Sequence, residues 1–187
     1  MTTRQQLSGK GDTDTDIDTE SNSDSDSDTA LAGQPAAYLT GLAYEALIAY
    51  TRAKQAEKGH TQPQYWLLRN LSKNDISPDG EGMSVPELQE AMAAYIRPED
   101  DLAAEAAVLV ERGWLTRDAD GRLWLTERGE QARVDLARNA PAIRAALHEG
   151  IDDADYVTTV KVLQRLIRNA GGPAGRRSPV TGASRSA

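Results

Sequence analysis

The chain has 187 residues, with 29 acidic and 21 basic side chains and a net charge of -8. This charge excludes a generally basic nucleic-acid coat protein. The lack of cysteine excludes a disulfide framework, a thiol nucleophile and a thiolate metal site, and two histidines leave little for zinc binding or general base catalysis. The longest apolar runs are far shorter than the roughly 18 residues that span a bilayer, and the N-terminus is acidic, so we expect a cytoplasmic chain with no membrane partner.

Both ends of the chain have the composition of disordered tails. Residues 1–30 contain eight acids, two bases and almost nothing apolar, so ordering them would cost about 1 to 2 kcal/mol of backbone entropy per residue without a hydrophobic return. Calcium binding is the alternative, because aspartates alternate over residues 12–18 as in an EF-hand loop. However, Ile17 and Ser23 stand where that loop needs Gly and Glu. Residues 170–187 are predicted to be a short basic tail.

The part between the tails, residues 31–169, is predicted to be one domain of six helices and one hairpin. A first helix at 37–58 is apolar on most of its circumference, which indicates that it packs against two partners. Two capping boxes follow, Thr61-Gln62-Pro63-Gln64 and Ser84-Val85-Pro86-Glu87, and each predicts the start of a helix.

Stop and turn signals delimit the remaining elements. Pro98 has the place of a first helical residue, and the three acids that follow suit the positive end of the helix dipole. An Asp-Gly pair at 120–121 between two short apolar runs predicts a hairpin. Thr126 is expected to cap a helix that kinks or breaks near Pro141, and Asp152 to open the last helix. This order predicts a mainly α fold with a small β-hairpin wing, a winged helix-turn-helix flanked by one N-terminal and two C-terminal helices.

The chain resembles the MarR family of transcriptional regulators over about residues 37–169. The segments that carry the resemblance are residues 61–68, 84–88 and 111–115, Asp120-Gly121-Arg122, and Leu125-Thr126-Glu127-Arg128-Gly129. The resemblance implies a homodimer joined through residues 37–58 and 127–169. It also implies a DNA-binding lobe at 60–126, with the fourth helix in the major groove and the wing arginine in the minor groove.

Candidate contact residues follow from these assignments. Those expected at DNA are Arg122, Arg117, Arg97, Ala103, Ala104, Ala107, Asp100, Arg69, Lys73 and Ser84, and those expected in the dimer are Leu39, Leu42, Tyr156, Val160, Leu163 and Ile167. Arg122 is expected to project from the tip of the hairpin, and Asp120 to support the wing by fixing the arginine geometry or the turn. The acids at 99–101 either accept hydrogen bonds from cytosine amino groups or stabilise a helix start.

The leading hypothesis is a sequence-specific DNA-binding regulator that acts as a homodimer and responds to a small molecule. The alternative is a winged-helix module that has lost DNA binding and engages a basic protein, because residues 60–130 hold 14 acids and seven bases. No catalytic motif is present, so we expect neither an enzyme nor a cofactor. His60 and His148 lack partners at metal-ligand spacing, and the three tryptophans are expected in the core rather than in a ligand pocket.

Overall fold

The computed structural model describes residues 28–172, and most of both predicted tails, including the calcium-loop alternative, lies outside this range. The chain divides into two units, Met1–Glu45 and Ala46–Ala187. In the first unit, residues 28–32 are helical, so a helical turn includes the last residues of the predicted acidic tail, and α2 begins at residue 36. None of the helices in the described range is long and apolar enough to cross a membrane.

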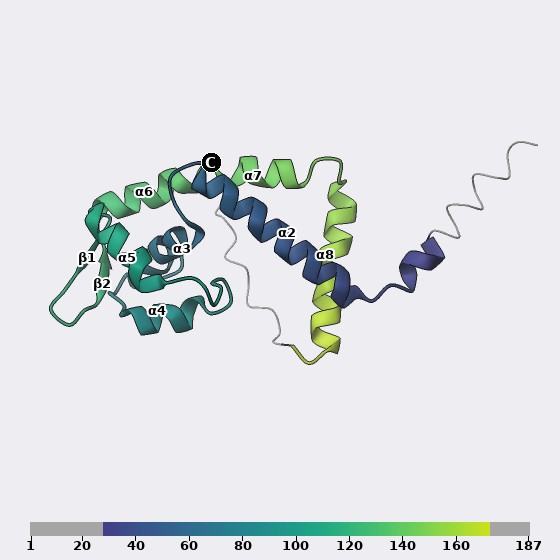
Figure 1. The fold of residues 1–187 in the computed structure, drawn as a ribbon, viewed down its shortest axis with the longest axis horizontal. Coiled ribbons are helices and arrows are strands. Elements are labelled where there is room, and N and C mark those ends of the chain that lie inside the picture. Colours follow the sequence, from purple (N-terminus) through teal and green to yellow (C-terminus); the bar gives the residue numbers. More distant parts are fainter. Residues whose placement is uncertain (1–27, 173–187) are drawn as a thin grey trace, which may run out of the picture. The chain divides into compact units, whose positions relative to one another are not determined.

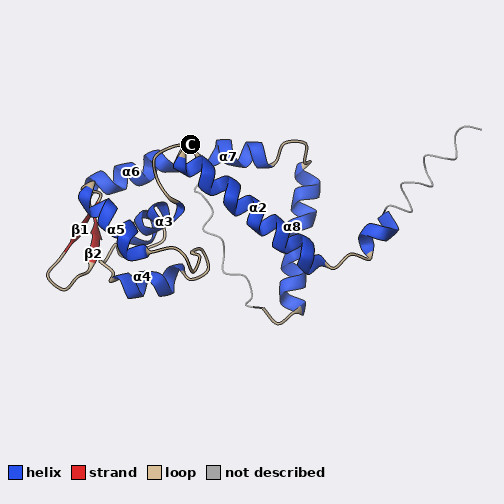
Figure 2. Cartoon of the chain, in the orientation of Figure 1, coloured by secondary structure: helices blue, strands red, loops and turns tan. Residues whose placement is uncertain are grey.

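The element order within residues 28–172 agrees with the predicted winged helix-turn-helix (Figures 1 and 2). It runs α2 (Ala36–Ala56), α3 (Gln62–Leu71), α4 (Val85–Met92), α5 (Leu102–Glu111), β1 (Leu115–Arg117), β2 (Leu123–Leu125), α6 (Glu127–Ala137), α7 (Ala140–Leu147) and α8 (Asp153–Asn169). The fold class is therefore confirmed: the chain is mainly helical with one antiparallel hairpin, in which Leu115 pairs with Leu125 and Arg117 with Leu123.

Local signals in the sequence set most of these boundaries. Both predicted capping boxes are present, with Thr61 and Ser84 each accepting a hydrogen bond from the backbone three residues later. Thr126 caps α6 in the same way. The predicted kink near Pro141 is a break between α6 and α7, and the proline lies in the first turn of α7, where its missing N–H leaves no helical hydrogen bond unmade.

The predicted start of α5 is wrong by four residues. Pro98 lies in a turn, and the helix begins at Leu102. The reason is that Asp101 acts as the N-cap and accepts hydrogen bonds from the backbone N–H groups of Ala103 and Ala104, both at 3.0 Å. Of the three acids expected to stabilise the helix start, Asp101 does so directly.

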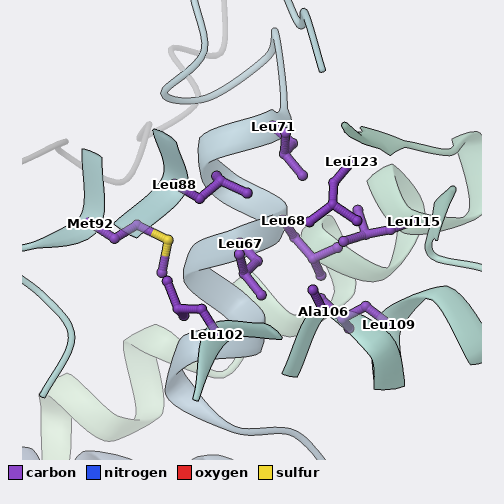
Figure 3. Close-up of a cluster of buried hydrophobic side chains, with 10 residues drawn as sticks. All are labelled: Leu67, Leu68, Leu71, Leu88, Met92, Leu102, Ala106, Leu109, Leu115 and Leu123. Atoms are coloured by element: carbon purple, nitrogen blue, oxygen red, sulfur yellow. The ribbon is translucent and has the colours of Figure 1, made fainter. Parts of the chain in front are cut away.

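The core of the second unit is built around α3 (Figure 3). Leucines from α3 meet apolar side chains from α4, α5 and both strands; the fully buried set is Leu67, Leu68, Leu71, Leu88, Met92, Leu102, Ala106, Leu109, Leu115 and Leu123. Burying a leucine side chain stabilises a fold by about 1.5 to 3 kcal/mol. The core therefore fixes the recognition-helix candidate α5 and the hairpin against the same helix.

A residue of the loop before α4 also pairs with the hairpin, and the sequence did not indicate this pairing. Met83 forms an antiparallel bridge with Leu123 through two backbone hydrogen bonds of 3.1 and 2.8 Å. Beside it, the indole of Trp124 lies against Gly82, where an added Cβ would be 2.6 Å from Nε1. The loop before α4 is thus attached to β2 by backbone pairing and by close packing that only glycine permits.

Ion pairs and hydrogen bonds attach α6 to the end of α3 and to the turn that follows it. Arg133 of α6 donates to Asp75 and, at 2.7 and 3.0 Å, to both carboxylate oxygens of Glu130. Glu130 also accepts hydrogen bonds from Ser72 and Asn74 at 2.7 and 3.0 Å. The bonds from Arg133, followed by those from Ser72 and Asn74, outweigh burial and lower the pKa of Glu130 from 4.5 to about 2.

The depressed pKa makes a pH-dependent contribution to stability. The ionised Glu130 stabilises the folded state fully above its unfolded pKa of 4.5, and this contribution is lost as the pH falls through about 2. We expect Glu130→Gln to lower the free energy of unfolding at pH 7 by about 1 to 2 kcal/mol and to flatten its decrease on acidification. Urea denaturation at fixed protein concentration measures both effects. Parallel pH profiles for the two proteins would contradict this assignment.

Candidate functional site

Three polar contacts hold α5 in place. Arg52 of α2 pairs with Asp100, Gln64 donates to Glu105 at 2.7 Å, and Arg112 donates to the carbonyl oxygen of Gly59 at 3.1 Å. They lie before the start, on the first turns and after the end of α5. The helix is thus fixed along its length by residues of α2, α3 and the loop between them.

The contact of Arg52 corrects the role predicted for Asp100. Asp100 was expected on the outward face of the helix, whereas it lies before the helix and its side chain is 8% exposed. Its two oxygens accept hydrogen bonds from Arg52 at 2.8 and 2.6 Å, and one also accepts the backbone N–H of Arg97 at 2.7 Å. Burial alone would raise the pKa of Asp100, but these hydrogen bonds outweigh it and lower the pKa. Asp100 therefore holds the turn before α5 in place, and its carboxylate is not available to contact a DNA base.

The outward face of α5 is small and acidic. Ala103, Ala104 and Ala107 are exposed, as predicted for the reading face, and so are Asp101 and Glu111. Methyl side chains let a helix approach a groove floor closely and can contact thymine methyl groups. The carboxylates near both ends of α5 would instead repel phosphates, so any affinity for DNA must come from cations elsewhere.

Asp118, and not the predicted Asp120, organises the wing. One oxygen of Asp118 accepts the backbone N–H groups of Asp120 and Arg122 at 3.0 and 2.9 Å, and the other accepts the indole N–H of Trp124 at 2.8 Å. The bond from Trp124 is the largest of the effects that lower the pKa of Asp118. Asp120 lies exposed in the turn, before a glycine at φ 79°. The sequence shows an Asp at both positions and does not distinguish them.

The side chain of Arg122 lies back against the domain rather than projecting from it. Its Nε donates to the carbonyl oxygen of Gly82 at 2.8 Å, and its terminal nitrogens approach Glu87 of α4. Arg117, on the neighbouring strand, is exposed and makes no ion pair within residues 28–172. The wing therefore presents Arg117 to solvent, while Arg122 connects the wing to α4.

The other predicted phosphate contacts differ in availability. Arg69 does not present the free cation that was predicted, because it is 8% exposed and pairs with Asp75 at 2.9 Å. Its Cζ atom also lies 4.6 Å from the ring centre of Trp66. Arg97 contacts Glu99 at 3.4 Å, and the Ser84 hydroxyl is engaged with Glu87 in the capping box. Lys73 is exposed in the turn after α3. The sequence did not indicate the role of Arg69 because Asp75 lies in the turn after α3, outside the helix that carries Arg69.

A partly open cavity of about 690 Å³ lies beside α3. Its apolar lining comes mainly from α3, α6, α7 and α8, and consists of Tyr65, Trp66, Leu136, Pro141, Ile143, Leu147 and Tyr156. Trp66 packs on the core and stacks on Tyr95 with ring centres 4.2 Å apart, but it also lines this cavity. The expectation of a purely structural Trp66 is therefore incomplete. The volume suits a small organic molecule.

Two buried polar atoms of the same cavity find no hydrogen-bond partner among residues 28–172. They are Gln55 Oε1 and His60 Nδ1. Burial is the main cause that lowers the pKa of His60, so the surroundings favour the neutral imidazole. His148 also lines the cavity, and the ring centres of His148 and Tyr156 are 4.1 Å apart. No cluster of three or more metal-ligating side chains occurs among residues 28–172.

The predicted dimer residues lie on two helices. Leu39 and Leu42 of α2 are 47% and 52% exposed, and Leu163 and Ile167 of α8 are 36% and 46% exposed. Tyr156 and Val160 are half-buried. No residue of α8 is fully buried. Each helix therefore exposes apolar side chains in the single chain.

Several solved structures with the same fold are MarR-family transcriptional regulators. A MarR family protein of Mycobacterium tuberculosis is 22% identical, with a TM-score of 0.55 over 71% of this chain and 93% of that chain. The apo form of wild type MarR from E. coli is 17% identical, with a TM-score of 0.55 over 72% and 97%. A MarR regulator of Methanosarcina mazei is 20% identical, with a TM-score of 0.52 over 72% and 94%.

The M. tuberculosis protein has also been solved in complex with DNA and with p-aminosalicylic acid. No family model and no curated protein matches this chain. The similarity to the solved structures confirms the resemblance seen in the sequence at the level of the winged-helix fold.

The contacts of Arg122 change the expected effect of its removal on stability. A surface arginine would leave stability almost unchanged, but Arg122 makes a charged hydrogen bond to a backbone carbonyl. We expect Arg122→Ala to lower the free energy of unfolding by about 1 kcal/mol, and the matched Arg117→Ala by less than about 0.5 kcal/mol. Thermal and urea unfolding measure both. Equal effects would mean that Arg122 projects freely, as the sequence suggested.

Proposed function

We propose that the protein is a transcriptional regulator that binds double-stranded DNA in a sequence-specific manner as a homodimer, and that a small molecule modulates this binding. The observation that carries the proposal is the exposed face of α5, with Ala103, Ala104 and Ala107, on a helix that packs against the exposed wing. Such a face fits the major groove, which is wide enough for an α-helix. The DNA complex of the M. tuberculosis protein, which has the same fold, supports this assignment.

In this proposal Arg117 is the main wing contact. It is exposed and unpaired within the described part of the chain, whereas Arg122 is engaged with Gly82 and Glu87. Lys73 and Arg97 are further phosphate contacts. Because few cations are available and acids flank α5, the affinity should be modest and should fall steeply with salt. Arg122 reaches the minor groove only if it leaves its present partners.

The dimer is proposed to form through α2 and α8. On each of these helices, taken by itself, apolar side chains are more than a third exposed: Leu39 and Leu42 on α2, and Leu163 and Ile167 on α8. Burying them against a second copy would remove apolar area from water. Two copies would place two α5 helices on one duplex, and successive major grooves on one face are about 34 to 36 Å apart.

The cavity beside α3 is the proposed effector site. Its volume of about 690 Å³, its aromatic lining and its unpartnered polar atoms at Gln55 and His60 suit a small ring-containing molecule. The p-aminosalicylic acid complex of the M. tuberculosis protein is consistent with an effector of this size.

The alternative function is a winged-helix module that binds a basic protein. The observation that favours it is the set of exposed acids Glu90, Asp101 and Glu111 on α4 and α5, which make no ion pair within residues 28–172. A basic partner would satisfy these carboxylates, whereas DNA would not. The two functions differ in their response to duplex sequence and salt.

Selection of bound fragments from random duplexes, followed by fluorescence anisotropy at several salt concentrations, tests DNA binding. We expect a preferred sequence, a linear decrease of log affinity with log salt, and a slope reduced by about one in Arg117→Ala, which should weaken all duplexes about equally. Arg138→Ala is the matched control, because this exposed arginine at the end of α6 pairs with Asp135. The absence of any preferred duplex would favour the protein-binding alternative.

Replacing Leu163 tests the dimer. We expect Leu163→Asp to convert the dimer into a monomer, because it places an unpaired charge in an apolar interface. The control Thr158→Asp adds the same charge on another side of α8, about 140° around the helix axis from Leu163. This variant should remain a dimer. Analytical ultracentrifugation at micromolar concentration measures both. A wild-type chain that sediments as a monomer would refute the dimer.

A further inference from the structure

One short segment of the chain both lines the cavity and holds α5. Thr51, Gln55, His60 and Gln62 line the cavity. The same stretch of sequence contains Arg52, which pairs with Asp100, and Gly59, whose carbonyl oxygen accepts from Arg112. The segment that lines this side of the cavity therefore also contains residues that fix the recognition-helix candidate.

Gln62 connects the two sites directly. Its Oε1 accepts a hydrogen bond from Arg52 Nε at 2.9 Å, while both terminal nitrogens of Arg52 donate to Asp100 at 2.8 and 2.6 Å. Asp100 immediately precedes Asp101, the N-cap of α5. A bidentate arginine holds its partner in a fixed geometry, so hydrogen bonds through Arg52 connect Gln62 to the turn before α5.

The orientation of the Gln62 amide follows from the chemistry of its partner. Arginine has only donors, so the atom that faces Arg52 must be the amide oxygen. The NH₂ end is then the free end, and Nε2 makes no hydrogen bond to any described residue. Gln62 lines the partly open cavity, so an oxygen of a molecule inside the cavity can accept from this donor.

We propose that Gln62 senses the cavity ligand, a ring-containing apolar molecule with a carbonyl or carboxylate oxygen, and that the Gln62–Arg52–Asp100 chain transmits its binding to the start of α5. The inference rests on the proposed function, because it explains how an effector would alter DNA binding. The ligand oxygen accepts from Gln62 Nε2, and the resulting shift of the amide displaces Arg52 and the turn before α5.

Hydrogen exchange of the full-length protein at residues 101–107 tests the connection without requiring DNA. We expect Gln62→Met, which removes the hydrogen bond from Arg52 to Gln62, to speed exchange in this segment at least about threefold. The control is Gln131→Met, the same substitution at an exposed glutamine of α6 that lies outside the cavity lining and donates to Asp135 at 3.2 Å. Its exchange should stay within about twofold of wild type. Equal exchange in both variants would overturn the connection.

Two probes of the same shape test the ligand class. Acetophenone carries a carbonyl oxygen, and α-methylstyrene replaces it by a methylene group that cannot accept a hydrogen bond. We expect acetophenone to change exchange at residues 101–107 and the DNA affinity of the wild-type protein at least about threefold, and α-methylstyrene to have no such effect. Gln62→Glu, which can still accept from Arg52 but has no NH₂, should lose the response. Equal effects of the two probes, or no effect of acetophenone, would overturn the assignment.

These readouts separate the inference from the proposed function. A protein that binds no duplex, yet whose exchange responds to Gln62→Met and to acetophenone, would refute DNA regulation and retain the sensor. A protein that binds a preferred duplex with the same affinity in wild type, Gln62→Met and Gln131→Met would retain DNA binding and refute the sensor.

Discussion

Helix α3 is buried along most of its length, and this burial constrains everything packed around it. Its leucines form the centre of the core with α4, α5 and the hairpin, so the apolar side of α3 leaves no room for a polar group. Its other side carries Arg69, which must find a partner inside the protein because a buried, unpaired charge is costly. Asp75 supplies that partner, and through Arg133 and Glu130 the same network fixes α6. Helix α3 thus positions both the recognition-helix candidate α5 and the wall of the cavity.

The acidic composition of the lobe has a different meaning once the contacts are known. Asp100 and Glu105 count against DNA binding in a sum of charges, yet both are bound to side chains of other elements and hold α5 in position. The cations are engaged as well, since Arg69 and Arg122 are paired with acids of this lobe. What a duplex would meet is therefore set by a few exposed groups, of which Arg117 on the wing is the clearest cation, rather than by the net charge.

The sequence predicted those features whose causes lie within a few residues. The capping boxes at Thr61 and Ser84 and the Asp-Gly turn depend on local hydrogen bonds, so their patterns can be read directly. The start of α5 was misplaced because Pro98 and Asp101 offer competing local signals. The roles of Arg69, Asp100 and Arg122 could not be predicted, since the sequence does not show whether a charged side chain faces DNA or pairs with an opposite charge inside the protein. The cavity was missed because its lining comes from several separate elements.

The packing of Trp124 against Gly82 also restricts which sequences this fold can accept. An added Cβ at position 82 would overlap the indole, so a chain with tryptophan at 124 is limited to glycine at 82. A larger residue becomes possible at 82 only after the aromatic ring has been replaced by a smaller side chain. That intermediate would lose the indole bond to Asp118, on which the wing turn depends. Position 124 must therefore change before position 82, and the route between acceptable pairs passes through a less stable wing.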